Sequence, residues 1–119
     1  MGHRILRVGI AAWLVAGPPS STGADAGAPV DLKSPSTIQR GQELFNQACS
    51  NCHGENAGGG LVVFQGRTDL IPQEIFDTIS NGRIRGSNLM PAWKESLSEG
   101  ERWELTAFIL SLAAEPARR

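Results

Sequence analysis

Apolar side chains recur at spacings of three and four residues in three separate stretches of the chain. The first stretch runs from about Pro35 to Ala48, and its apolar face carries Ile38, Gly41, Leu44, Phe45 and Ala48. This spacing predicts an amphipathic helix. Ser34 or Ser36 can cap its first turn, where a proline is tolerated.

Two further helices follow from the same pattern. One is expected from about Pro72 to Ser80, and Asn81-Gly82 ends it as a C-terminal cap. The last begins at Ser98, which forms the S-x-x-E capping box with Glu101, and runs to about Ala114. Residues 54–69 and 83–97 are expected as loops. No stretch of useful length alternates between apolar and polar residues, so the pattern predicts an all-α domain with three main helices.

The N-terminus has the layout of a secretory signal peptide. A basic start precedes the apolar run from Val8 to Gly17, and Ala24-Asp25-Ala26 fits the A-x-A cleavage pattern. We therefore expect residues 1–26 to be removed, 27–35 to form a flexible mature N-terminus, and 36–115 to form the single domain. The protein is then periplasmic. An uncleaved membrane anchor is the alternative, although the apolar run is short for a membrane span.

Length and charge narrow the possible functions. A chain of 119 residues with a net charge of −1 fits one small domain and gives no electrostatic argument for binding nucleic acid. So short a domain buries little apolar surface and often depends on a disulfide, a metal or a cofactor.

The residues with the clearest chemistry are Cys49-Ser50-Asn51-Cys52-His53, which match C-x-x-C-H, the attachment motif of c-type haem. Two thiols on one helical turn can reach the two vinyl groups of one porphyrin, and the next residue can present its imidazole to the iron. The sequence therefore predicts one covalent haem c on Cys49 and Cys52, with His53 as an axial ligand. The apolar residues 61–64 have some strand character, but a loop folded over this cofactor is favoured.

Two other interpretations of the cysteines fit the sequence less well. A thioredoxin-like redox pair expects a strand before the motif, whereas here a helix leads into it and glycines follow. A zinc site needs a fourth cysteine or histidine ligand, and the other histidine of the chain, His3, lies in the predicted signal.

Met90 is the expected second axial ligand. It is the one methionine besides Met1, it lies in an irregular segment, and Pro91 stiffens the backbone after it. A packed loop methionine beside an iron without this ligand is the alternative. A thioether opposite a histidine raises the haem potential and favours electron transfer.

Taken together, these motifs resemble those of the class I c-type cytochromes, over roughly residues 37 to 114. Gly41 and Phe45 match the family's helix-crossing glycine and aromatic residue, and Leu105 and Phe108 match their partners on the last helix. Met90-Pro91-Ala92-Trp93 matches the methionine loop. The resemblance implies a small cytochrome c fold, in which the first and last helices cross near a right angle around one haem.

Two details of the resemblance are incomplete. Many relatives have a proline soon after the haem motif whose carbonyl accepts the histidine ring N–H, but no proline lies between His53 and Pro72. We expect another carbonyl in the loop 58–66 to take this role. Gly66-Arg67 is similar to a pair that touches a haem propionate in some relatives, so Arg67 is either a propionate contact or a solvated charge.

The expected function is electron transfer between redox-partner proteins such as a dehydrogenase, a reductase or a terminal oxidase, and not catalysis. A ligand-binding or sensing module with a labile Met90 is an alternative, and so is a haem subunit of a larger oxidase or dehydrogenase complex. No nucleic-acid partner is expected, and attachment to a membrane is expected only if the signal peptide is not cleaved. Arg83, Arg85 and Lys94 suggest a docking face for an acidic partner, or an ordinary solvated loop.

Overall fold

A computed structural model describes Gly9 and residues 28–117 of the chain. The helices in this part are α1 (Pro35–Ala48), α2 (Ser50–His53), α3 (Pro72–Asn81) and α4 (Glu99–Ala113). A 3₁₀ turn, η1 (Glu55–Ala57), follows α2, and the strands β1 (Arg83–Arg85) and β2 (Asn88–Met90) precede α4. Apart from Gly9, the predicted signal peptide lies outside the described residues. Within them, no helix has the length and apolarity that a bilayer span requires.

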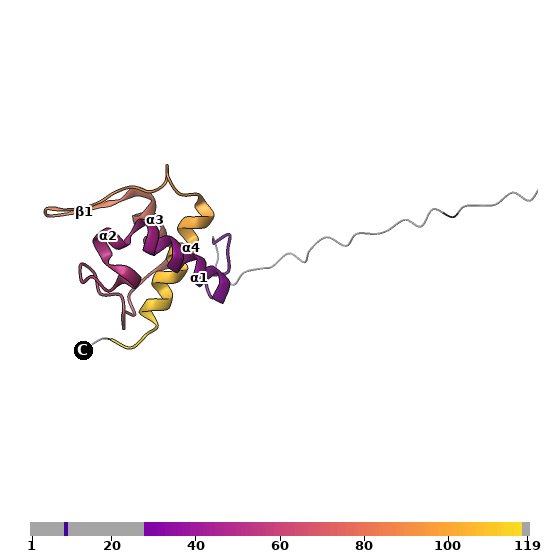
Figure 1. Ribbon diagram of the computed structural model, residues 1–119, viewed down its shortest axis with the longest axis horizontal. Helices are drawn as coiled ribbons and strands as arrows, with labels where there is room; N and C mark the ends of the chain where they lie inside the picture. The colour runs from indigo at the N-terminus through magenta and orange to yellow at the C-terminus, as the bar shows by residue number, and fades with distance from the viewer. Residues whose placement is uncertain (1–8, 10–27, 118–119) are drawn as a thin grey trace, which may run out of the picture.

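The first and last helices cross in close contact at the centre of the molecule (Figure 1). Gly41 makes this possible, because a Cβ atom there would collide with the Glu104 carbonyl and lie 2.8 Å from Cβ of Phe108. Next to the crossing, the rings of Phe45 and Phe108 meet edge to face with centroids 5.3 Å apart. Phe45 and Leu105 are almost fully buried. The predicted roles of these residues in the helix crossing are confirmed.

The predicted ends of α3 and α4 agree with the structure, whereas the predicted serine cap of α1 was wrong. Ser98 and Glu101 form both hydrogen bonds of the capping box at the start of α4. Gly82 ends α3 with φ of 74°, a left-handed conformation that glycine adopts without strain. At α1, Ser34 occupies the cap position, but its hydroxyl lies 3.0 Å from that of Ser36 and does not cap the helix.

The segment before α1 differs from the expectation of a flexible N-terminus over residues 27–35. Leu32 is only 4% exposed and packs in a cluster with Trp103 and Ala107 of α4. Pro35 already belongs to α1. The prediction was wrong because α4 is apolar on a second face, and this face is covered by the residues that precede α1.

The predicted loop 83–97 contains a β-hairpin. Its strands pair antiparallel, with Arg83 opposite Met90 and Ile84 opposite Leu89, and it projects from the body of the molecule (Figure 1). Gly86-Ser87 forms the turn, and Gly86 has φ of 57°. Such a glycine-led pair is a known hairpin signal. The strands lack alternating burial, because every residue except Met90 is exposed, and this is why the apolar pattern missed them.

Candidate functional site

Cys49, Cys52 and His53 lie on one helical turn. Cys49 ends α1, where its N–H donates to the Phe45 carbonyl at 2.8 Å. The Cys49 carbonyl then accepts from the N–H groups of Cys52 and His53, at 3.2 and 2.9 Å. Gly54, with φ of 76°, stops α2 directly after the histidine. The chain therefore presents two thiols and one imidazole in the tight arrangement that the C-x-x-C-H spacing predicts.

The two thiols have different surroundings. Cys52 is exposed, whereas Cys49 is half-buried against the main core cluster, and both are free. Burial, with a smaller contribution from the nearby Cys52, raises the pKa of the Cys49 thiol to about 11. Reactive redox cysteines usually have a lowered pKa, because the thiolate is the nucleophile. The surroundings of Cys49 thus argue against a thioredoxin-like redox pair.

The imidazole of His53 lies beside two aromatic side chains. Its ring centroid is 5.8 Å from that of Phe45 and 6.2 Å from that of Phe64. Burial lowers the pKa of His53, which favours the neutral imidazole, the form that binds a metal. Within the described part of the chain, the buried Nδ1 has no hydrogen-bond partner. A neutral, half-buried imidazole with an unpaired nitrogen fits a haem-iron ligand.

The carbonyl that we expected to accept the His53 ring N–H is not found in the loop 58–66. Instead, the N–H of Gly59 donates to the backbone carbonyl of His53 at 2.8 Å. A Cβ atom on Gly59 would lie 2.8 Å from the same carbonyl oxygen, so the loop packs tightly on the histidine backbone. The loop therefore holds His53 through its main chain.

A group of amide side chains anchors the turn that follows His53. Asn56, in the left-handed region with φ of 52°, donates its N–H to Asn46 Oδ1 at 2.8 Å. Its own Oδ1 accepts from Nδ2 of Asn46 and Nε2 of Gln42, at 3.0 and 2.8 Å. This cluster of amide side chains was not predicted from the sequence. The available signal was the tolerance of asparagine for left-handed backbone in a glycine-rich segment.

Met90 ends the second hairpin strand and is half-buried against the main core cluster, which also contains Phe45 and Phe64. Its backbone lies against the end of α3, where a Cβ atom on Gly82 would be 2.5 Å from the Met90 carbonyl oxygen. The same apolar cluster therefore contacts Cys49, His53 and Met90.

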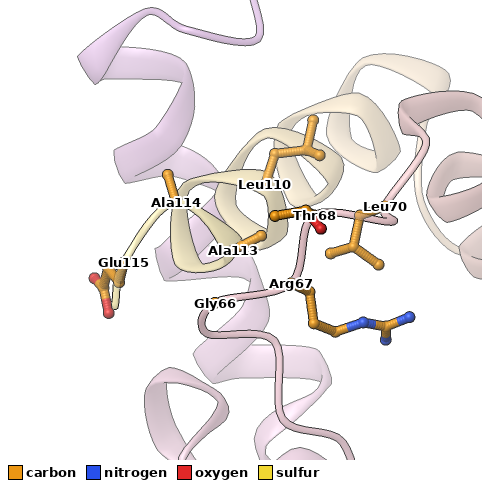
Figure 2. A pocket seen from close by; sticks show the side chains of 8 residues that line it. All are labelled: Gly66, Arg67, Thr68, Leu70, Leu110, Ala113, Ala114 and Glu115. Atoms are coloured by element: carbon orange, nitrogen blue, oxygen red, sulfur yellow. The ribbon is translucent and has the colours of Figure 1, made fainter. Parts of the chain in front are cut away.

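Arg67 is not brought together with these residues. Its guanidinium forms a two-point ion pair with Asp69, at 2.9 and 2.6 Å, which lowers the pKa of the Asp69 carboxyl. Arg67 borders a cavity of about 480 Å³ between the loop that begins at Gly66 and the end of α4 (Figure 2). The residues of the C-x-x-C-H motif and Met90 do not line this cavity. A propionate contact for Arg67 stays a prediction.

Comparison with known proteins places the chain in a family. Residues 36–109 match the model described as cytochrome C oxidase, cbb3-type, subunit III. Cytochrome c6 of Euglena viridis is 30% identical over 86 residues, which are 64% of this chain and 93% of that protein. The cbb3-type cytochrome c oxidase subunit CcoP of Azospirillum brasilense is 29% identical over 62% of this chain and 28% of its own length.

A solved structure supports the same fold. Cytochrome CL of the marine methylotroph Methylophaga aminisulfidivorans MPT superposes with a TM-score of 0.56 and 26% identity, over 72% of this chain and 59% of that one. The chain belongs to the family of c-type cytochrome domains found in subunit III of cbb3-type oxidases, and its cofactor is a covalently bound haem c. The chain spans less than a third of the length of the oxidase subunits that it matches.

Proposed function

We propose that the protein is a single-haem electron carrier. The observation that carries this proposal is the helical turn with Cys49, Cys52 and His53, beside an apolar cluster that also contacts Met90. When bound, haem c supplies one-electron chemistry by cycling its iron between the ferrous and ferric states. The chain contributes attachment, two axial ligands and an apolar surrounding, and it serves as a carrier, not an enzyme.

Each site residue has a distinct role in this proposal. Cys49 and Cys52 would each hold the cofactor through a thioether bond, and the neutral imidazole of His53 would ligate the iron. The Met90 thioether would be the other protein ligand of the iron, and a thioether opposite a histidine would raise the reduction potential of the bound haem. Phe45 and Phe64 flank the imidazole and restrict water around it. His53 and Met90 together would leave no open position on a bound haem iron, which favours electron transfer over ligand binding.

The test is a spectrum and a mass of the protein produced in a periplasm that attaches haem. We expect one covalent haem, and in the ferric form the weak long-wavelength charge-transfer band of a methionine–iron bond. Met90→Ala should abolish this band and keep the haem attached, whereas Cys49→Ala with Cys52→Ala should abolish attachment. A wild-type protein without haem would refute the proposal.

The cellular setting follows from the same proposal. The predicted signal peptide supports a periplasmic location for the carrier, where redox-partner proteins would donate and accept its electron. The exposed cations Arg83, Arg85 and Lys94 are proposed to face an acidic partner. No acidic residue lies between Gly82 and Lys94.

A role as the haem subunit of a larger oxidase complex is a second candidate, because three of the similar proteins are cbb3-type oxidase subunits. Co-purification with a membrane-bound oxidase from the native cells would support this role. Recovery of the haem protein entirely from the periplasmic fraction, free of oxidase, would favour the free carrier.

A further inference from the structure

The segment after Met90 is tied to the last turn of α3. The N–H of Trp93 donates to the Ile79 carbonyl at 3.0 Å, and the N–H of Lys94 donates to the Ser80 carbonyl at 3.2 Å. The last carbonyls of a helix lack partners within the helix, so α3 uses them here to hold the methionine segment. These contacts, together with the close approach of Gly82 to Met90, attach this segment to the end of α3.

A side chain from α4 holds this end of α3 in place. Nη1 of Arg102 donates to the hydroxyl of Ser80 at 2.6 Å, and the Ser80 hydroxyl in turn donates to the Phe76 carbonyl at 2.7 Å. Ser80 is only 5% exposed. A hydrogen bond from a charged donor in so sheltered a place is among the stronger polar contacts of a small protein.

The guanidinium is held in place by apolar contacts as well. Its Cζ lies 4.9 Å from the centroid of the Phe76 ring, and the ring of Phe76 stacks on Trp103, with centroids 4.2 Å apart and planes inclined by 14°. Arg102 is thus packed over the Phe76 ring and bonded to Ser80 at the same time. Its position is defined, unlike that of a freely moving surface cation.

The placement of this charge is informative. Arg102 lies near the first turn of α4, where the positive end of the helix dipole disfavours a cation, but its guanidinium reaches the last turn of α3, where the negative end favours one. The contact with Ser80 therefore stabilises the end of α3, while Nε of the same guanidinium donates to the Ser98 carbonyl at the start of α4 at 3.3 Å.

We infer that Arg102, acting through Ser80, is a positioning residue for Met90. Arg102 holds the Ser80 side chain in place. The carbonyls of Ile79 and Ser80 in turn accept the N–H groups of Trp93 and Lys94. These contacts keep the nearby Met90 in position as an iron ligand. The inference rests on the proposed function, in which Met90 ligates the haem. It concerns how firmly the ligand is held, and so how rarely the iron becomes five-coordinate.

The test measures how fast Met90 leaves the ferric iron. Imidazole is mixed with the haem-loaded ferric protein, and the rate at saturating imidazole reports dissociation of the thioether. We expect Arg102→Gln and Ser80→Ala each to raise this rate by about tenfold, the factor that one lost charge-assisted hydrogen bond corresponds to. The double variant should lose Met90 no faster than the more affected single variant, because both substitutions remove the same hydrogen bond between Arg102 and Ser80.

Arg40→Gln is the matched control. Arg40 pairs with Glu104 of α4 at 3.7 Å, and its side chain is 72% exposed, so the rate should stay at the wild-type value. Arg102→Lys, which keeps the charge and a donor, should recover part of the loss. If Arg102→Gln does not fold, Ser80→Ala decides the question.

Two results would overturn the inference, and they are distinguishable. A wild-type charge-transfer band with unchanged imidazole rates in both variants would show that the contact serves stability alone. A wild-type ferric protein without that band would refute ligation by Met90, and with it both the proposed ligand set and the positioning role.

Discussion

Asn46 and Asn56 are joined by reciprocal hydrogen bonds across the haem motif. The N–H of Asn56 donates to Asn46 Oδ1 at 2.8 Å, and Nδ2 of Asn46 donates to Asn56 Oδ1 at 3.0 Å. Asn46 lies on α1 before the motif, and Asn56 lies on the turn after it. The pair therefore closes a small loop around Cys49, Cys52 and His53 and fixes the turn that follows the histidine.

This relationship makes Asn46→Ala informative. Alanine is the better helix former, so α1 itself should gain from the change. We nevertheless expect the haem-loaded protein to lose about 1–2 kcal/mol of unfolding free energy, because two hydrogen bonds disappear and the left-handed Asn56 loses its support. Unfolding by guanidinium chloride, followed by helical circular dichroism, measures the loss. Gln47→Ala, at an exposed position of the same helix, is the control and should leave the midpoint unchanged or slightly higher.

The helix crossing predicts opposite outcomes for two glycines. Gly41→Ala introduces a methyl group where the Glu104 carbonyl already lies, and overpacking of this kind should lower stability by about 1–3 kcal/mol. Gly100→Ala is the comparison, because the nearest atom to its new Cβ is Ser98 Oγ at 4.0 Å. Within a helix, that change should stabilise by up to about 1 kcal/mol. Equal effects of the two substitutions in thermal unfolding would refute the close approach.

Much of this architecture was accessible from the sequence, for local reasons. The periodicity of α1, α3 and α4, the capping box of Ser98 and the C-x-x-C-H spacing all depend on residues within a few positions of one another. Gly41 was also identified, although its partner Glu104 is distant in the chain, because the resemblance supplied the crossing. Haem attachment was predicted from one short motif and is confirmed by the family of the chain.

The missed features depend on tertiary contacts or weak signals. The burial of Leu32 requires the second apolar face of α4 at Trp103 and Ala107, which no local pattern connects to the N-terminus. The hairpin is exposed on both faces, so its three-residue strands show no alternating burial, and Gly86-Ser87 was the one local indication. The bond from Arg102 to Ser80 joins residues 22 positions apart. Such a pair becomes visible only when α3 and α4 are placed side by side.

Arg67→Gln tests the alternative roles of this residue. Because Asp69 already engages the guanidinium at two points, we expect the haem reduction potential to be the same as in the wild type, and stability to change little, as for most exposed ion pairs. The pKa of Asp69 lies below its ordinary value, so the small contribution of the pair is present at neutral pH and is lost as the pH falls through that lowered value. A clear shift of the potential at neutral pH in Arg67→Gln would instead establish a propionate contact.

The cations of the segment 83–94, namely Arg83, Arg85 and Lys94, allow a prediction in which the local charge and the overall charge have opposite effects. The formal net charge of the chain is −1, so the whole molecule weakly repels an anionic oxidant such as hexacyanoferrate(III), and added salt would speed the reaction. If Arg83, Arg85 and Lys94 instead surround the point of electron exit, the oxidant is attracted there, and salt should slow the reaction of the ferrous protein. We expect this slowing, and a several-fold lower rate at low salt for Arg83→Gln with Arg85→Gln.

The control variant Arg40→Gln removes an exposed cation on α1 and should react at the wild-type rate. A rate that rises with salt, or an equal loss in the control, would show that the hairpin is not the docking face.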